Sequence, residues 1–215
     1  MTASAQTVLA PKTIEDRLDE FGARVAERLA PKFQAAGVPY PPQCVTLLGF
    51  KEERMLEVQA ADADGVFHFV CAYPVLAASG GPGPKLREGD RQVPEGIYAI
   101  ESLNPNSLFH LALRVGYPNE SDCARAEAEG RAEPGTDIMI HGDAVSSGCL
   151  AMGDAAAEDL FVLAALTGVE NVNAVLAPCD FRRREISVQA GAPAWTGELY
   201  RQLKSKLARF PSASR

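Results

Sequence analysis

Residues 140–154 read IHGDAVSSGCLAMGD and place a histidine and a cysteine eight positions apart. A thiol is a strong nucleophile only as the thiolate, and a nearby imidazole can accept its proton. His141 ends an expected strand and Cys149 precedes an expected helix, so the loop between them could fold the thiol back against the imidazole. The backbone amides of Gly148 and Cys149 could then donate to a developing oxyanion. The stretch predicts a nucleophile and a base, the alternative being an inert buried cysteine and a histidine bound to a backbone carbonyl.

Other polar residues could bind a substrate or shape this site. They are Lys85, Arg91, His110, Asp143, Ser146 and Ser147. The two cations could hold a carboxylate or be solvated loop charges. His110 could orient the substrate or simply pack in a strand. Asp143 could orient His141, although side chains close together in an extended chain point to opposite sides. The serines could donate hydrogen bonds or only form the turn. A metal site of His141, Cys149 and His110 is the weakest alternative, because no carboxylate cluster supports it; we expect neither metal nor cofactor.

A helix is expected at each end of the chain. Apolar residues at three- and four-residue steps predict one over residues 12–36, with Thr13 as its cap, Asp16 in its first turn, and a kink or an end at Pro31. The amphipathic segment 196–210 predicts the other.

Between these helices the pattern is mostly that of strands. The expected strands span residues 44–50, 55–60, 66–75, 97–103, 107–117, 136–142 and 171–178. Residues 78–96 are rich in Gly and Pro and predict a long loop, whereas residues 121–135 look partly helical. After Cys149, Asp154 could cap a helix that stops at Gly168. The fold class is therefore α+β: an N-terminal helical segment (1–39), a mostly β catalytic domain (40–190) and a C-terminal helix (191–215).

Composition narrows the possible partners and compartments. The 215 residues carry a net charge of −7, which disfavours nucleic acid because phosphate binding needs a basic face. No run of 18 apolar residues predicts a transmembrane helix. The Ala3-Ser4-Ala5 pattern resembles a signal-peptidase site, the alternative being a tail of small residues. The five cysteines include no CxxC spacing, and the sequence leaves open whether Cys44, Cys71, Cys123 or Cys179 forms a disulfide.

Three blocks of the sequence resemble the YkuD-type L,D-transpeptidases, and most closely their YafK-like branch. HGDAVSSGCLAMGD (141–154) is similar to that branch's HG-(D/N)-x-V-S-x-GC-x-A-M-x-D stretch. SGGPGPKLREGDRQVPEG (79–96) resembles its SGG-x-GPK-x-x-EGD-x-x-x-PEG loop, and LNPNSLFHLALRVGYPN (103–119) resembles its NPNS-x-(F/Y)-HL segment. The resemblance implies a YkuD-like core of mixed sheets forming a sandwich or barrel-like shape.

The resemblance also implies a chemistry. Cys149 falls on the nucleophile position and His141 on the base position. The implied thiolate attacks the carbonyl of meso-diaminopimelate in its L,D-bond to D-Ala, forming a thioester that water or an amine resolves. The branch includes an amidase that detaches the outer-membrane lipoprotein from peptidoglycan.

Three positions depart from the wider family or from parts of the branch. Ala151 stands where many members have an Arg two residues after the Cys, and the YafK-like branch also has Ala there, so this residue favours the branch. Ser147 replaces a His that some transpeptidases carry before Gly-Cys, which leaves His141 as the base. Ala144 stands where branch members can carry a second Cys.

The resemblance therefore implies a cysteine-dependent acyl-transfer enzyme of peptidoglycan stem peptides, hydrolytic in outcome. It would act in the periplasm on a peptidoglycan peptide or a peptidoglycan-linked lipoprotein. The alternatives are a true L,D-transpeptidase that forms 3→3 crosslinks or lipoprotein attachments, an exported toxin aimed at a cell wall, and a non-catalytic peptidoglycan-binding module. The acyl acceptor and the oligomeric state stay open.

Overall fold

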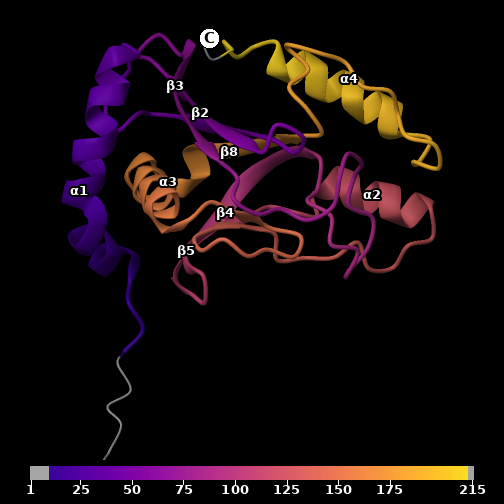
Figure 1. Ribbon diagram of the computed structural model, residues 1–215, viewed down its shortest axis with the longest axis horizontal. Helices are drawn as coiled ribbons and strands as arrows, with labels where there is room; N and C mark the ends of the chain where they lie inside the picture. The colour runs from indigo at the N-terminus through magenta and orange to yellow at the C-terminus, as the bar shows by residue number, and fades with distance from the viewer. Residues whose placement is uncertain (1–9, 213–215) are drawn as a thin grey trace, which may run out of the picture.

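The computed structural model describes residues 10–212, so the Ala3-Ser4-Ala5 pattern lies outside the described part of the chain. Within that part, a mixed eight-stranded sheet curls into a half-barrel and four α-helices pack around it (Figure 1). The strand order is β3-β2-β1-β8-β4-β5-β6-β7. This architecture confirms the α+β fold class.

The elements follow one another along the chain as α1, β1 to β5, α2, β6, β7, α3, η1, β8 and α4. The helices are α1 (Ile14–Ala35), α2 (Glu120–Ala128), α3 (Asp154–Thr167) and α4 (Thr196–Leu207), with a short 3₁₀ turn η1 (Val169–Asn171). The strands are β1 (Val45–Phe50), β2 (Met55–Ala61), β3 (Phe67–Pro74), β4 (Gly96–Ser107), β5 (His110–Val115), β6 (Met139–His141), β7 (Leu150–Ala151) and β8 (Val172–Ala177).

The sheet combines antiparallel hairpins with two parallel pairs. β1 pairs antiparallel with β2, and β2 with β3. The long strand β4 pairs with β8 near its start and with β5 along the rest of its length. β1 runs parallel to β8, and β6 runs parallel to β7. The second parallel pair places the segment of Cys149 beside the segment of His141.

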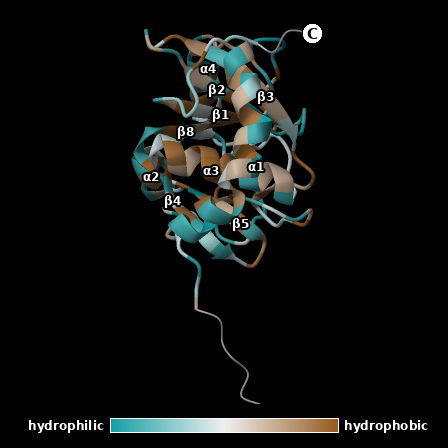
Figure 2. Cartoon of the chain, turned by 90° about the vertical axis from the view of Figure 1, so that its left-hand side faces the viewer, coloured by the Kyte–Doolittle hydropathy of each residue, from teal (hydrophilic) through white to brown (hydrophobic). Residues whose placement is uncertain are grey.

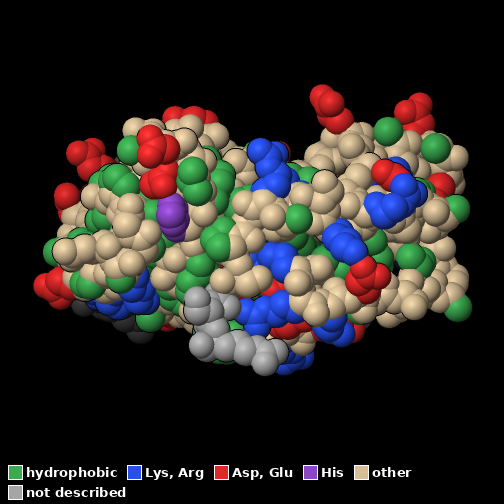
Figure 3. Space-filling model, turned by 90° about the horizontal axis from the view of Figure 1, so that it is seen from above, with side chains coloured by type: hydrophobic (Ala, Val, Ile, Leu, Met, Phe, Trp, Pro, Cys, Tyr) green, Lys and Arg blue, Asp and Glu red, His purple; other side chains and the backbone are tan. Residues whose placement is uncertain are grey.

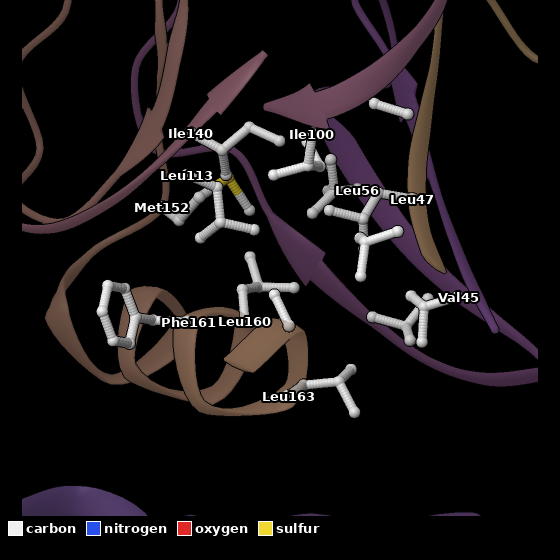
Figure 4. Close-up of a cluster of buried hydrophobic side chains, with 14 of the residues drawn as sticks. Val45, Leu47, Leu56, Ile100, Leu113, Ile140, Met152, Leu160, Phe161 and Leu163 are labelled. Atoms are coloured by element: carbon white, nitrogen blue, oxygen red, sulfur yellow. The ribbon is translucent and has the colours of Figure 1, made fainter. Parts of the chain in front are cut away.

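Helices cover both faces of the centre of the sheet, and β1 shows how. All six of its residues are buried; Val45 and Leu47 join the core under α1 and α3, whereas Leu48 and Phe50 join the core under α4. Because side chains alternate between the two faces of a strand, a strand covered on both sides reads as a continuous apolar run. Figure 4 shows the first core, in which Ile140 and Met152, from the segments that flank the candidate site, pack with Leu160.

α3 lies inside the molecule, and α1 packs on it. Residues 156–164 of α3 are all buried, and the helix is largely brown in Figure 2. A helix that is apolar all round needs partners on every side. α1 instead buries one stripe, formed by Phe21, Val25, Leu29 and Phe33.

Two expectations about the helices need correction. α1 does begin with a capping box between Thr13 and Asp16, as predicted. It continues through Pro31 to Ala35, however, so the expected end at Pro31 is wrong. Asp154 does not cap α3: it is the first residue of that helix, and its carboxylate accepts a hydrogen bond from the amide of Asp143 at 2.8 Å.

The remaining elements follow the sequence pattern closely. The segments expected as strands overlap β1 to β6 and β8, although β4 (Gly96–Ser107) is longer than the expected 97–103, and the segment 121–135 largely contains α2. A difference occurs at 107–117, where Ser107 still belongs to β4 and a tight turn precedes β5 at His110. The division of the chain at residues 39 and 190 stays a prediction.

A buried ion pair fastens the loop 78–96 to the sheet. Lys51 follows β1, and its Nζ lies 3.2 Å from Glu95 Oε1. The same ammonium donates to the carbonyl oxygens of Gly83 and Val93, each at 2.9 Å, and Glu95 Oε1 accepts the amide of Gly83 at 2.7 Å. Burial lowers the pKa of Lys51 and raises that of Glu95, whereas each charge opposes the shift of the other. Gly83 inside the loop and Val93 near its end are thereby held to the same ion pair.

The surface carries charges of both signs. Acidic and basic side chains are interspersed on the face shown in Figure 3, and on α4 Arg201 pairs with Glu198 and Lys204 with Glu185. None of the helices within residues 10–212 is long and apolar enough to cross a membrane.

Replacing Lys51 by Met should destabilise the protein by about 3–5 kcal/mol, because it leaves the Glu95 carboxylate buried without its counter-charge. Urea unfolding followed by circular dichroism measures this loss. Arg201→Met is the matched control, since it breaks an exposed ion pair and should cost at most about 1 kcal/mol. Equal effects of the two substitutions would contradict the role given to Lys51.

Candidate active site

The parallel pairing of β6 and β7 brings His141 and Cys149 to one face of the sheet. Ile140 pairs with Leu150 and His141 with Ala151. Ile140 and Leu150 both point into the core, so their neighbours His141 and Cys149 point to the opposite face. The cysteine lies one step before β7, diagonally across from the histidine.

The thiol of Cys149 is half-buried and contacts the backbone. Its Sγ accepts a hydrogen bond from the amide of Met139 at 3.4 Å and lies 3.6 Å from the carbonyl oxygen of Asp137. Burial raises the pKa of Cys149, and the charge of Asp137 acts in the same direction; the Met139 amide and the charge of Lys85 oppose this rise. The resting sulfur is therefore a thiol rather than a thiolate near neutral pH.

His141 is buried, with 2% of its surface exposed. Its Nδ1 lies 2.6 Å from the carbonyl oxygen of Gly142. A carbonyl only accepts, so Nδ1 carries the proton and Nε2 has the free lone pair. Burial lowers the pKa of His141, against the opposing effects of the Gly142 bond and the charge of Asp143. The imidazole is accordingly neutral near neutral pH and able to accept a proton.

The thiol and the imidazole share no hydrogen bond in the part of the chain that the structure describes. Such contacts are often long in a substrate-free site and tighten when substrate binds. With the thiol pKa raised and the imidazole pKa lowered, the proton rests on sulfur and must move during the attack.

Two serines hold the backbone around the cysteine. Ser146 Oγ accepts the amide of Cys149 at 3.0 Å and donates to its carbonyl oxygen at 2.6 Å. Ser79 Oγ accepts the amide of Gly148 at 2.7 Å and donates to the carbonyl oxygen of Arg91 at 2.7 Å. Gly148 has a φ of +96°, which glycine adopts without strain. The loop 78–96 is thus bonded directly to the residue before Cys149.

The two amides expected to bind an oxyanion already have acceptors here. Gly148 donates to Ser79 and Cys149 donates to Ser146. An oxyanion could use either amide only by replacing a serine hydroxyl. Ser146 accordingly has a positioning role in this structure, whereas Ser147 is exposed and its hydroxyl has no hydrogen bond to any residue of the described chain.

The two expected cations occupy different environments. Lys85 is buried, and its ammonium donates to Asp90 Oδ1 at 2.7 Å and to the carbonyl oxygen of Arg87 at 2.9 Å. Arg91 is exposed, has a φ of +56°, and lies beside Gly148. Within residues 10–212, the guanidinium of Arg91 has no ion pair or hydrogen bond. Its backbone lies next to Gly148, and binding of a carboxylate by its side chain stays a prediction.

His110 and Asp143 have mainly structural partners. Nε2 of His110 lies 3.1 Å from Glu158 on α3, and the His110 ring meets Phe21 of α1 edge-on at 5.4 Å. The carboxylate of Asp143 is exposed and accepts the amide of Ala144. Asp143 influences His141 through its charge rather than through a hydrogen bond. No group of three His, Cys, Asp or Glu residues between 10 and 212 is arranged to hold a metal ion.

Sequence reasoning missed two residues that contact this site. Ser79 begins the Gly-rich block and could have been noticed as the polar residue of that block. Phe109, whose ring lies 4.8 Å from that of His141 between centroids, occupies the aromatic position of the NPNS-x-(F/Y)-HL segment, but an aromatic residue near a strand is usually a core residue.

Comparison with known proteins adds family and fold. The model of the YkuD family, described as the L,D-transpeptidase catalytic domain, matches residues 50–172, which is 123 of 215 residues. The chain is 37% identical over 114 residues to the protein named "Putative L,D-transpeptidase YafK" in Escherichia coli (strain K12), and equally to its counterpart in E. coli O157:H7. This match covers 52% of the chain and 44% of the relative, so the chain spans less than half the length of these curated relatives.

Solved structures agree on the fold. The helical cell shape determining protein Pgp2 of Campylobacter jejuni superimposes with a TM-score of 0.50 at 16% identity, over 93% of this chain and 79% of the other. Its K307A mutant gives a TM-score of 0.51 at 19% identity, over 91% and 60%. Since the family model covers more than half of the sequence, the chain belongs to the YkuD family of L,D-transpeptidase catalytic domains.

Proposed function

We propose that this protein is a cysteine-dependent acyl-transfer enzyme of peptidoglycan stem peptides, acting in the periplasm and hydrolytic in outcome. The observation that carries the proposal is the shared face of His141 and Cys149 across β6 and β7, with Nδ1 of His141 held by the Gly142 carbonyl. The family membership supplies the substrate class: a diaminopimelate carbonyl in an L,D-peptide bond.

The chemistry proceeds through a thioester. As the sulfur of Cys149 attacks the substrate carbonyl, Nε2 of His141 takes the thiol proton. The tetrahedral intermediate expels the leaving amine, which receives that proton from the imidazolium. Water then attacks the thioester and gives one proton to Nε2 of His141. The tetrahedral intermediate expels the Cys149 thiolate, which takes that proton, and the carboxylic acid product loses its remaining acidic proton to solvent.

Two observations support further parts of the proposal. Ala151, where many family members carry Arg, is fully buried and bridges to Ala77, so an arginine could not be accommodated there without local displacement of the packing. Arg91, from the loop 78–96, is the free cation beside Gly148, and we assign it the substrate carboxylate. In the same proposal, water is the acyl acceptor and a peptidoglycan-linked lipoprotein is a substrate.

Cys149→Ala should reduce product formation from muropeptides to background, because no other group in the site can form the thioester. His141→Ala should lower kcat by roughly 10²–10⁴-fold, the usual contribution of a general base. Mass spectrometry of products from intact sacculi measures both and separates trimmed or released peptides from crosslinked ones. Unchanged turnover in Cys149→Ala would disprove the mechanism. A product in which an amine has joined the acyl peptide would show that the enzyme catalyses transpeptidation instead of hydrolysis.

Arg91→Gln should raise KM roughly 10–100-fold with little change in kcat, because it removes a charged hydrogen bond made in both the ground state and the transition state. Steady-state kinetics on a soluble muropeptide tests this. Arg87→Gln, an exposed arginine of the same loop, is the matched control and should behave like the wild type. If both variants lose activity equally, the loop as a whole and not Arg91 is responsible.

The reactivity of Cys149 toward iodoacetamide should keep rising with pH through the alkaline range, because burial raises the thiol pKa. The acid limb of kcat/KM should fall below the usual histidine value of about 6.5, because the lowered pKa keeps His141 neutral to lower pH. Alkylation rates and kcat/KM across pH 5–10 check these limbs. A thiol fully reactive at pH 6 would indicate a resting thiolate–imidazolium pair instead.

A further inference from the structure

The turn between β4 and β5 reaches over the candidate base. Leu108 and Phe109 form the tip of this hairpin, between Ser107 and His110. Leu108 is almost fully exposed at 97%. The ring of Phe109 lies 4.8 Å from that of His141 between centroids, with the two planes 32° apart. Both apolar residues of the turn are exposed, but the ring of Phe109 contacts the imidazole.

Phe109 covers the imidazole from the solvent side. His141 is only 2% exposed, whereas Phe109 retains 39% exposure. The close approach of the hairpin depends on a glycine: a Cβ at Gly142 would lie 2.7 Å from the carbonyl oxygen of Phe109. The aromatic ring and the bare backbone of Gly142 together help to explain why a polar side chain at the end of β6 is buried.

The N-terminal part of the chain holds the hairpin in this position. Asn106 makes two hydrogen bonds with the backbone of Lys12, one through each end of its side-chain amide, at 2.8 and 2.7 Å. Arg17 of α1 donates to the carbonyl oxygen of Pro105 at 2.9 Å. At the tip, Ser107 Oγ accepts the amide of Phe109 at 3.1 Å. The ring over His141 is thus attached to a rigid support.

We propose that Phe109 is a positioning residue for His141: its ring lies against the imidazole, excludes water from it, and keeps Nδ1 on the carbonyl of Gly142. The expected effect on the reaction rate rests on the proposed function, because the position and solvation of His141 affect the rate only if it is the base for Cys149. The pKa of His141 can be measured independently of that function.

The charged groups near His141 set the background for any titration. Asp143 lies in the loop after β6, Asp154 begins α3 beside Gly142, His110 belongs to β5, and Cys149 precedes β7. All four remain when Phe109 is replaced. The change in solvation of the imidazole is therefore the difference that the substitution introduces.

Phe109→Ala should raise the pKa of His141 toward its ordinary value, since burial is the largest cause of its low pKa. With three histidines in the chain, NMR titration of the imidazole signals resolves each one, and His68→Gln and His110→Gln variants assign them. The kcat should fall roughly 10–100-fold with KM little changed, because misplacing a catalytic group costs rate rather than binding.

Three further variants make the test specific. Phe109→Tyr keeps the flat ring and should restore both the low pKa and the rate. Phe109→Leu keeps apolar volume without a ring and should give an intermediate pKa, which provides a reading if the alanine variant is poorly folded. Leu108→Ala removes the exposed neighbour in the same turn and should match the wild type.

An unchanged pKa of His141 in both Phe109→Ala and Phe109→Leu would overturn the proposal, as would an equal shift in Leu108→Ala. If Phe109→Ala shifts the pKa while even the wild type makes no product from muropeptides, the proposed function fails and the role of Phe109 toward His141 stands.

Discussion

The site depends on one short contact, the parallel pairing of β6 with β7. Together these strands hold only a few residues, yet their register decides which side chains share a face. Ile140 and Leu150 enter the core, and this leaves His141 and Cys149 on the other side. A shift of the pairing by one residue would turn the imidazole and the thiol to opposite faces, so burial of the two apolar neighbours keeps His141 and Cys149 on one face.

Polar contacts outside the reacting atoms hold the rest of the site. Lys51 and Glu95 hold Gly83 and Val93 of a loop that has no regular structure, and Ser79 ties that loop to Gly148. Ser146 binds both the amide and the carbonyl of Cys149. The β4–β5 hairpin that carries Phe109 is held by α1, through the hydrogen bond from Arg17 to the carbonyl oxygen of Pro105. The reacting groups thus lie on strands and turns whose positions are set by buried charges and backbone bonds, which is how precise sites are usually supported.

Local pattern was sufficient to predict much of this arrangement. Alternation and apolar runs predict the strands, and the capping box at Thr13 predicts the start of α1, because these signals act within a few residues. The compact HG…GC stretch and the Gly-rich block indicate the nucleophile, the base and the family. The fold class and the family were confirmed, whereas the roles of Cys149 and His141 remain predictions.

The sequence could not predict the partners that side chains find across the fold. The ammonium of Lys85 is taken by Asp90, and the imidazole of His110 is bound by Glu158, 48 residues further along the chain. The periodic pattern predicts a helix over 12–36 but not whether it ends at Pro31; α1 continues because its apolar stripe packs on α3 and the sheet, and tertiary packing overrides a local helix breaker. Asp154 holds the backbone of Asp143 instead of capping its own helix. Each of these outcomes depends on contacts that exist only in the folded chain.

The central claim is that Cys149 forms a covalent thioester with a peptidoglycan stem peptide, with His141 as the base. Intact-protein mass spectrometry after brief mixing with muropeptide and acid quenching tests it most directly. The account predicts an adduct of the acyl peptide mass on Cys149, sensitive to hydroxylamine, absent in Cys149→Ala and slow to form in His141→Ala. Product formation by the wild type without any adduct, or an adduct that persists in Cys149→Ala, would contradict the account.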